Sequence, residues 1–279
     1  ASAQYIYEQN LGENVYIRLQ MKCREIIENI EKSYSRNYAL EWDNVGLLAG
    51  SHEKEVRRIY VALDATDEVI EAAKAAGADL LVTHHPMIFS PVSRITDEDF
   101  IGRRLLRLIQ GNIAYYAMHT NYDVLRMSEL SGEYLGLSDA RILEVTCETP
   151  KEEGIGRVAD LPDPVSLQDY CETVKKAFGL QTVQVFGDLA GAVKRIAVSP
   201  GSGKSMIDPA IAMGADVLVT GDIGHHEGID AVARGLAVID AGHYGIEHIF
   251  IKDMKQFLER SFAGVEVITA PRKDPFTVL

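Results

Sequence analysis

The stretch Gly77-Ala-Asp-Leu-Leu-Val-Thr83 is repeated later in the chain as Gly214-Ala-Asp-Val-Leu-Val-Thr220. Each copy is a short apolar run after a glycine, which is the pattern of a strand buried on both faces. Arg58-Ile59 precedes the first copy, and Arg195-Ile196 precedes the second copy at the same spacing. Two matches at one spacing indicate an internal duplication. The sequence therefore predicts two related lobes.

Helix and strand patterns alternate in the same order around both copies. In the first half, a helix over 21–34 and a strand over 45–49 come before three strands, each followed by a helix, over 59–63, 80–83 and 113–118. In the second half, a helix over 166–178 and a strand over 183–186 come before three such strands, over 196–199, 217–219 and 237–239. Each lobe is thus helix-strand-(strand-helix)3. We predict an α/β fold with mostly parallel or mixed sheets covered by helices.

These patterns also divide the chain into segments. We expect a first α/β lobe over 21–137, a connecting hairpin and linker over 138–165, and a second α/β lobe over 166–279. Residues 1–20 show no clean period, and the amphipathic pattern begins at Met21. We therefore expect residues 1–20 to be a non-native or disordered extension.

Composition excludes several classes of protein. The chain has 41 acidic and 28 basic residues, a net charge of -13, which repels a nucleic-acid backbone. An anionic substrate would need a local metal ion or a group of amides to overcome this charge. The three cysteines form no Cys-x-x-Cys pair, so we expect a reducing cytoplasm rather than a disulfide framework. No apolar run approaches the roughly 18 residues that a membrane span needs, so no membrane partner is expected.

Histidines follow three of the predicted strands at their carboxyl ends, where open parallel sheets bind ligands. His84 and His85 follow the strand over 80–83, His119 follows the strand over 113–118, and His243 follows the strand over 237–239. The pair His84-His85 alone is equally typical of a hydrogen-bonded interior pair. The strand ends of two related lobes could, however, converge at their junction.

Two carboxylates accompany these histidines. Asp123 alone is more typical of a turn or helix cap, and the pair His243 and Glu247, four residues apart on one helix face, is more typical of a solvated surface. Together, imidazole and carboxylate groups from both lobes would make a metal site between them. Five such ligands exceed what one catalytic ion usually takes from protein, so they suit two ions.

Six motifs occur in an order typical of one family. They are Trp42-Asp-Asn-Val-Gly-Leu47, Thr83-His-His-Pro86, His119-Thr-Asn-Tyr-Asp123, Gly154-Ile-Gly-Arg157, Thr220-Gly-Asp222 and Gly242-His-Tyr-Gly-Ile-Glu247. From about Met21 to Phe276 the chain resembles the Nif-three-like family, commonly labelled GTP cyclohydrolase I type 2. The resemblance implies a ring-shaped homohexamer with its sites facing an interior cavity. It also implies a dinuclear metal site ligated by His84, His85, Asp123, His243 and Glu247.

The leading functional hypothesis is a dinuclear metal-dependent hydrolase that acts on a nucleotide-like or phosphorylated small molecule. Its two divalent ions would be zinc, iron, manganese or nickel, since the ligands are nitrogen and oxygen. His225, His226 or His119 would move protons, although His225 and His226 could equally have a structural role at a helix start. The competing hypothesis is a non-catalytic metal-binding ring protein for metal handling or regulatory partner binding. A dehydrogenase is disfavoured because no Gly-x-Gly-x-x-Gly opens a helix.

Two further features suggest other roles. Gly201-Ser-Gly-Lys-Ser205 is similar to a P-loop, but Val198 stands where that motif needs glycine. Its backbone amides could still receive an anionic group of a substrate. Trp42 is expected to be a core or interface anchor rather than a ring that stacks on a substrate.

Overall fold

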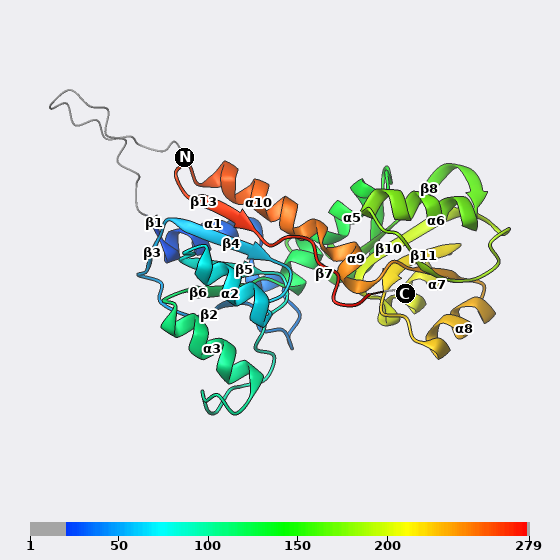
Figure 1. Cartoon of the computed structure of the whole chain (residues 1–279). Helices are drawn as coiled ribbons and strands as arrows, with labels where there is room; N and C mark the ends of the chain where they lie inside the picture. The colour runs from blue at the N-terminus through cyan, green and yellow to red at the C-terminus, as the bar shows by residue number, and fades with distance from the viewer. Residues whose placement is uncertain (1–20, 278–279) are drawn as a thin grey trace, which may run out of the picture.

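Residues 21–277 are described by a computed structural model in which two β-sheets are flanked by helices (Figure 1). The α/β class predicted from the sequence is confirmed, with mixed sheets covered by helices. The extension expected over residues 1–20 lies outside the described residues. Among the helices of the described part, none is long and apolar enough to cross a membrane.

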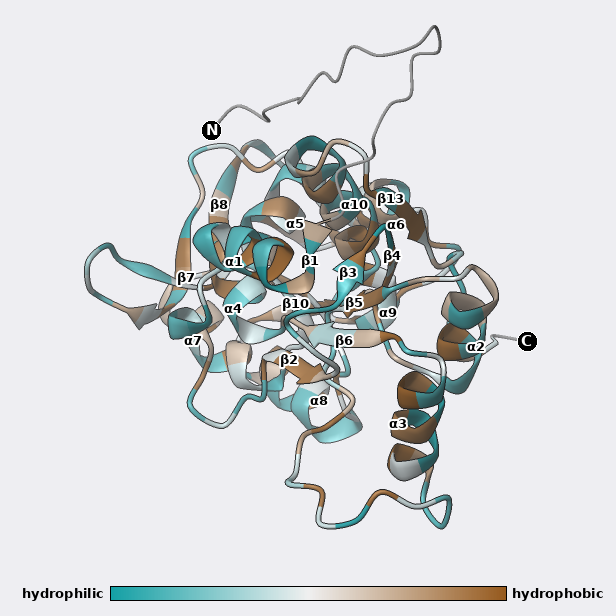
Figure 2. Ribbon diagram, turned by 90° about the vertical axis from the view of Figure 1, so that its left-hand side faces the viewer, coloured by the Kyte–Doolittle hydropathy of each residue, from teal (hydrophilic) through white to brown (hydrophobic). Residues whose placement is uncertain are grey.

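The first sheet has the strand order β13-β4-β5-β6-β2. Its parallel strands are β4 (Arg58–Ala62), β5 (Leu80–Thr83), β6 (Ala114–Ala117) and β13 (Glu266–Thr269), and β2 (Gly46–Ala49) runs antiparallel to β6. The helices that accompany it are α1 (Cys23–Ser33), α2 (Asp67–Ala75), α3 (Phe100–Gln110), α4 (Thr120–Tyr122) and α10 (Ile249–Ser261), the last of which contacts β13 and β4. Helix α3 carries hydrophobic and hydrophilic residues in alternation, as expected for a helix with one face on a sheet (Figure 2). A small antiparallel pair joins β1 (Met21–Lys22) to β3 (Glu55–Val56).

The second sheet has the strand order β7-β8-β10-β11-β12-β9. Its parallel strands are β10 (Ala192–Ser202), β11 (Val217–Gly221) and β12 (Ala237–Asp240), and its antiparallel strands are β7 (Arg141–Cys147), β8 (Glu153–Ser166) and β9 (Gln184–Phe186). The helices that accompany this sheet are α5 (Ser128–Tyr134), which contacts β8 and β10, together with α6 (Leu167–Phe178), α7 (Ile207–Ala212), α8 (His225–Ala233) and α9 (His243–Glu247).

The repeated stretches adopt the same local structure. Asp79 Oδ2 accepts a hydrogen bond from the backbone N–H of Arg58 (3.1 Å), and Asp216 Oδ2 accepts one from the backbone N–H of Arg195 (2.7 Å). In both copies the aspartate therefore ties the start of one parallel strand to the start of the next. The origin of these copies in a duplication stays a prediction.

Several segments differ from the expected division of the chain. Helix α5, expected in the first lobe, packs on β8 and β10 of the second sheet, and α10, expected in the second lobe, packs on β13 and β4 of the first sheet. Residues 266–269, expected in the second lobe, form β13 and pair in parallel with β4 of the first sheet (Figure 1). Residues 138–165, expected to form a hairpin and linker, supply β7 and nearly all of β8 to the second sheet. The β8 register against β10 shifts between Val193 and Arg195, which leaves room for the two prolines of 161–164.

Alternating side chains of the parallel strands enter different cores. Ile59 and Val61 of β4 belong to the same buried cluster as Ile196 and Val198 of β10, whereas Tyr60 faces the core beneath α2 and α3. The shared cluster also contains side chains of α1, α6 and α10. One continuous core thus joins the two sheets and fixes the relative positions of their strand ends.

Candidate metal site

The carboxyl ends of the parallel strands of both sheets meet at one cluster of histidines and carboxylates. His84 and His85 follow β5, and His243 begins α9 directly after β12. His85 Nε2 lies 3.0 Å from Glu247 Oε2 and 3.1 Å from His243 Nε2. The strand-end residues of the two halves therefore meet, as the sequence led us to expect. We call His84, His85, Asp123, His243 and Glu247 the histidine–carboxylate cluster.

Three groups of residues at this cluster have ligand atoms close enough to hold a metal ion. Within each group these atoms lie within 4.8 Å of one another: His85, His243 and Glu247; His84, Asp123 and Glu247; and His84, His85 and His119. Glu247 belongs to two of the groups, and its two oxygens face different histidines. Oε1 lies 3.7 Å from His84 Nε2, and Oε2 lies 3.0 Å from His243 Nε2. Glu247 therefore links the two halves of the cluster.

Two buried polar atoms of the cluster have no hydrogen-bond partner. They are His84 Nε2 and Asp123 Oδ1, which lie 3.2 Å apart. Leaving such atoms unsatisfied costs roughly 1–3 kcal/mol each, so their presence needs a reason. A divalent cation accepts electron pairs from both an imidazole nitrogen and a carboxylate oxygen. The donor set and its orphaned atoms thus fit a metal ion.

Local structure directs these side chains toward each other. His243 and Glu247 are one helical turn apart on α9, so their side chains share a face, as the spacing predicts. Asp123 begins a π-helical turn over Asp123–Met127, between α4 and α5. Single π-helical turns are common at functional sites because the extra residue redirects a side chain. No pattern in the sequence predicts this turn.

Groups outside the cluster hold three of the imidazole rings through Nδ1. Asp64 Oδ1 accepts from His85 (2.7 Å), Asp222 Oδ2 accepts from His243 (2.6 Å), and the Met118 carbonyl accepts from His84 (3.0 Å). Each bond leaves Nε2 free to act as a ligand, which is the usual arrangement around metal-bound histidines.

No pattern in the sequence predicts a role for Asp64, and Asp222 stands out only as part of the Thr220-Gly-Asp222 motif. Asp64 follows the strand over 59–63 and Asp222 follows the strand over 217–219, just as the histidines follow theirs. The position of each aspartate at the end of a predicted strand was the signal that could have identified it. Asp222 also adopts a left-handed backbone conformation, with φ of 56°, which is uncommon for a residue other than glycine.

Gly201 lies against the cluster where the Gly-Ser-Gly-Lys-Ser loop begins. Its φ is +78°, and a Cβ atom added to it would lie 2.6 Å from Glu247 Oε1. Only glycine therefore fits beside this carboxylate. Farther along the same loop, Lys204 pairs with Glu227, with 2.5 Å between Nζ and Oε1. The anion-binding role of the loop stays a prediction.

The close packing of histidines and carboxylates shifts their pKa values. Burial opposes the charged form of His84, but the charges of Asp123 and Glu247 outweigh it and raise its pKa to about 10. Burial likewise opposes the charged form of His243, but Glu247 and Asp222 raise its pKa to about 9. Burial also opposes the carboxylate of Glu247, but the neighbouring histidines hold its pKa well below the usual range. The cluster without metal therefore holds protons that an ion would have to displace.

We expect the stability of the metal-free protein to fall as the pH rises from 7 to 10. His84 and His243 bind protons more tightly in the fold than at their unfolded pKa of 6.5, so their contribution is complete below pH 6.5. It is lost as the pH rises through about 9 and about 10. Metal affinity should rise over the same range, because ligation requires neutral imidazole.

Thermal unfolding of chelator-treated and zinc-loaded protein between pH 6 and 10 checks this expectation. The difference in Tm between the two forms should widen with pH. A constant difference would contradict proton displacement at the cluster.

The three histidines expected to move protons lie in different surroundings. His119 lies beside the cluster, with its ring centroid 5.3 Å from that of His84, and its Nδ1 donates to Asp43 Oδ1 (2.9 Å). His225 and His226 are exposed at the start of α8, with ring centroids 5.1 Å apart. Within residues 21–277, no hydrogen bond or ion pair connects either of them to the cluster. A proton-transfer role for all three stays a prediction.

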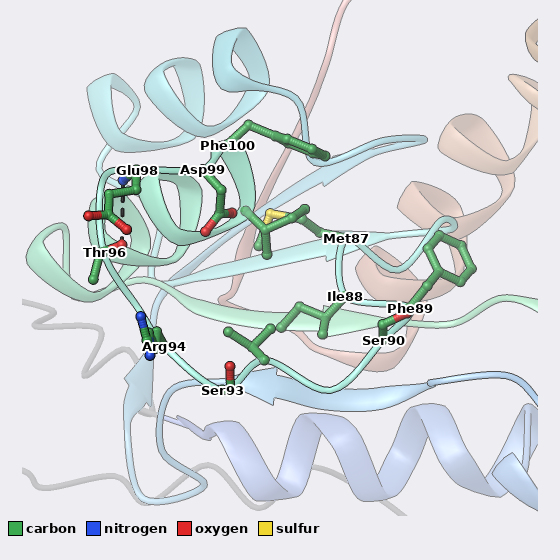
Figure 3. Close-up of a pocket in the computed structure, with 12 residues that line it drawn as sticks. Met87, Ile88, Phe89, Ser90, Ser93, Arg94, Thr96, Glu98, Asp99 and Phe100 are labelled. Atoms are coloured by element: carbon green, nitrogen blue, oxygen red, sulfur yellow. Dashed lines mark hydrogen bonds between the residues drawn. The ribbon is translucent and has the colours of Figure 1, made fainter.

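Trp42 is 60% exposed, so it is not a core anchor, and the alternative of an interface anchor stays a prediction. A separate surface cavity of about 490 Å³ lies along the loop between β5 and α3 (Figure 3). Its lining runs from Met87 to Ile101 and includes none of the cluster residues. The cavity is therefore not the chemical site.

Comparison with known proteins identifies the family. A family model described as Duf34/NIF3 (NGG1p interacting factor 3) matches residues 21–275. The chain belongs to this family. Among its relatives, a protein of Clostridium perfringens named GTP cyclohydrolase 1 type 2 homolog is 36% identical over 260 residues, covering 92% of this chain and 99% of the relative. A protein of Methanocaldococcus jannaschii with the same name is 34% identical over 254 residues, covering 89% and 99%.

Solved structures of NIF3 relatives share the fold. A hypothetical protein of Staphylococcus aureus superposes with a TM-score of 0.85 at 29% identity, covering 93% of this chain and all of that one (100%). Reduced HcgD from Methanocaldococcus jannaschii gives a TM-score of 0.78 at 32% identity, covering 90% and 98%. The NIF3 match thus extends over both sheets and includes every residue of the cluster.

Proposed function

We propose that the protein is a dinuclear metal-dependent hydrolase acting on a nucleotide-like or phosphorylated small molecule. The observation that carries this proposal is the pair of groups that share Glu247, each with its own histidine and carboxylate ligand atoms. His84, Asp123 and Glu247 would hold one divalent ion, and His85, His243 and Glu247 the other. The names of the relatives, GTP cyclohydrolase 1 type 2 homolog, support a nucleotide as the substrate.

Divalent ions in such a site supply Lewis-acid polarisation of the substrate and a water nucleophile at neutral pH. Other residues of the chain would orient the ligands and exchange a proton with the substrate. Asp64 and Asp222 fix the rings of His85 and His243. His119, held by Asp43, is the nearest additional imidazole and is suited to exchange a proton with the substrate.

The charge of the protein gives the ions a second role if the substrate is anionic. A net charge of -13 repels phosphate at long range. Two divalent ions would offset the negative charge locally, since their four positive charges would balance the carboxylates of Asp123 and Glu247 in the cluster and of Asp64 and Asp222 beside it. A homohexamer in a reducing cytoplasm stays part of the same proposal.

Asp123→Asn and His84→Ala should each lose metal and turnover together. Both substitutions remove a ligand atom from the group that contains the two orphaned buried atoms. Metal content of untagged protein, measured by inductively coupled plasma mass spectrometry, is compared with metal-dependent product from a set of nucleotides and phosphoesters. The exposed His225→Ala variant serves as the control and should keep its metal.

Two results would separate the alternatives. Full metal occupancy in both variants would remove Asp123 and His84 from the ligand set. Metal that exchanges readily, with no turnover on any compound of the set, would support a non-catalytic metal-binding ring protein instead.

A further inference from the structure

Two large aromatic side chains stand exposed beside the histidine–carboxylate cluster. The side chains of Trp42 and Phe89 are 60% and 55% exposed, and they come from different loops. Both rings contact the same imidazole at its edge or face: Trp42 lies 5.8 Å from His119 between ring centroids, and Phe89 lies 6.0 Å from it. His119 in turn shares a potential metal-binding group with His84 and His85.

The exposure of Trp42 is imposed by a firmly anchored loop. The next residue, Asp43, accepts hydrogen bonds from His119 Nδ1 (2.9 Å), Thr120 N (2.9 Å) and Thr120 Oγ1 (2.6 Å). Asn44 Nδ2 then donates to the carbonyl of Ile88 (2.6 Å), which ties this loop to the loop that carries Phe89. Before Trp42, the backbone N–H of Leu40 donates to Thr120 Oγ1 (2.9 Å), so the backbone that carries the exposed indole is anchored on both sides.

Exposed aromatic rings fixed near a reactive centre suit a flat ligand. A heteroaromatic ring stacks on an aromatic face whatever its pattern of hydrogen-bonding groups, because the stacking uses its π-face. Stacking also needs no charge, so it is not weakened by the acidic character of this protein. It would hold the uncharged end of a substrate while metal ions received a polar or anionic end.

We propose that Trp42 and Phe89 form a stacking site that binds an uncharged, flat heteroaromatic ring, such as a purine base, beside His119. The assignment of this ring to the substrate rests on the proposed hydrolase function. The binding itself can be measured without turnover. Trp42 thus has a ligand-binding role that its sequence context did not favour.

The chain contains a single tryptophan, so its fluorescence reports directly on this site. We would titrate the zinc-loaded full chain with guanosine, exciting at the red edge of the indole band and correcting for absorption with free tryptophan. Saturable quenching is expected with guanosine and none with ribose, inorganic phosphate or choline. Calorimetry should show that Trp42→Ala and Phe89→Ala each weaken guanosine binding roughly 10-fold, a typical effect of removing one stacking ring.

Phe100→Ala provides the matched control. Phe100 is 53% exposed and begins α3 at the far end of this loop, where it lines the same cavity as Phe89 (Figure 3), but Arg104 rather than His119 contacts its ring. Guanosine affinity should be unchanged in this variant. Equal losses in Phe89→Ala and Phe100→Ala would overturn the stacking site in favour of general damage to the loop.

Other outcomes also overturn the proposal. Quenching by ribose, phosphate or choline would mean that the rings do not select a flat base. Shielding of Trp42 from acrylamide, together with a smaller assembly of Trp42→Ala in sedimentation, would make the indole a contact between copies of the chain. Turnover that persists with unchanged guanosine affinity in both variants would refute the stacking site and leave the hydrolase standing. By contrast, guanosine binding that depends on both rings, with no turnover of any nucleotide or phosphoester, would support the stacking site and refute the hydrolase.

Discussion

Glu247→Gln is expected to abolish metal binding in both halves of the cluster. Glu247 is almost fully buried, and its two oxygens face His84 on one side and His85 and His243 on the other. An amide has one oxygen in place of two and no negative charge, so the group of His85 and His243 loses its carboxylate and the group of His84 and Asp123 loses one of its two. The loss of affinity should exceed the roughly 10–100-fold typical of removing an outer hydrogen-bond partner.

The same substitution should destabilise the metal-free protein. Removing one member of a buried set of ion pairs typically costs about 3–5 kcal/mol, because the remaining charges are left without compensation. The raised pKa values of His84 and His243 depend on this carboxylate, so the stability of the variant should also vary less between pH 7 and 10. Metal content and thermal unfolding in the presence of chelator measure the two effects separately.

Glu259→Gln is the matched control for this prediction. It makes the same chemical change on α10, at a residue that is exposed and pairs with Lys255. Exposed pairs of this kind contribute roughly 0.3–0.5 kcal/mol, so metal content and stability should stay near those of the parent protein. A folded Glu247→Gln protein that retains all of its metal would show that Glu247 is not a shared ligand.

Gly201→Ala should also remove metal, for a steric reason. The new methyl group would lie 2.6 Å from Glu247 Oε1, so either the carboxylate or the loop must move. Displacing a ligand by a fraction of an ångström is enough to lower affinity, because metal sites tolerate little error in ligand position. The positive φ of +78° adds backbone strain of roughly 1–2 kcal/mol.

Gly235→Ala separates these two effects. Gly235 has a similar φ of +88°, but nothing lies within 4 Å of a Cβ atom built on it. This control should lose stability through backbone strain and keep its metal. If Gly201→Ala and Gly235→Ala have equal metal content, the contact between Gly201 and Glu247 does not position the carboxylate.

Several elements could be predicted because their signals are local. Strand β5 spans the residues that the repeat predicted, and all four of them are buried. A short apolar run of this kind, bounded by a glycine before it and polar residues after it, is typical of a central strand. The one-turn spacing of His243 and Glu247 likewise predicted a shared helix face, and their side chains lie 3.0 Å apart. Their role as ligands stays a prediction.

Other features depend on partners that are distant in the sequence. Strand β13 pairs with β4, some 200 residues earlier, and nothing in its few residues specifies that partner. The roles of Asp64 and Asp222 could not be predicted, because a carboxylate after a strand is common. They follow only from the hydrogen bonds to His85 and His243, which come from other segments of the chain. Trp42 lies outside the core, the first of its two expected places, because the hydrogen bonds of Asp43 and Asn44 anchor its loop at the surface, whereas hydrophobicity alone favours burial.

The sequence by itself determined the α/β class, the order of the elements and the strand ends at which the polar residues stand, because periodicity and glycine punctuation act over a few residues. Only the tertiary structure decided that the strand ends of both sheets converge on Glu247. That convergence arises from the single core shared by the two sheets, whose packing involves side chains from the whole chain at once. The two copies of the repeated strand thus occupy equivalent positions in the two sheets. The packing of the core between the sheets determines which polar residues at the strand ends lie close together.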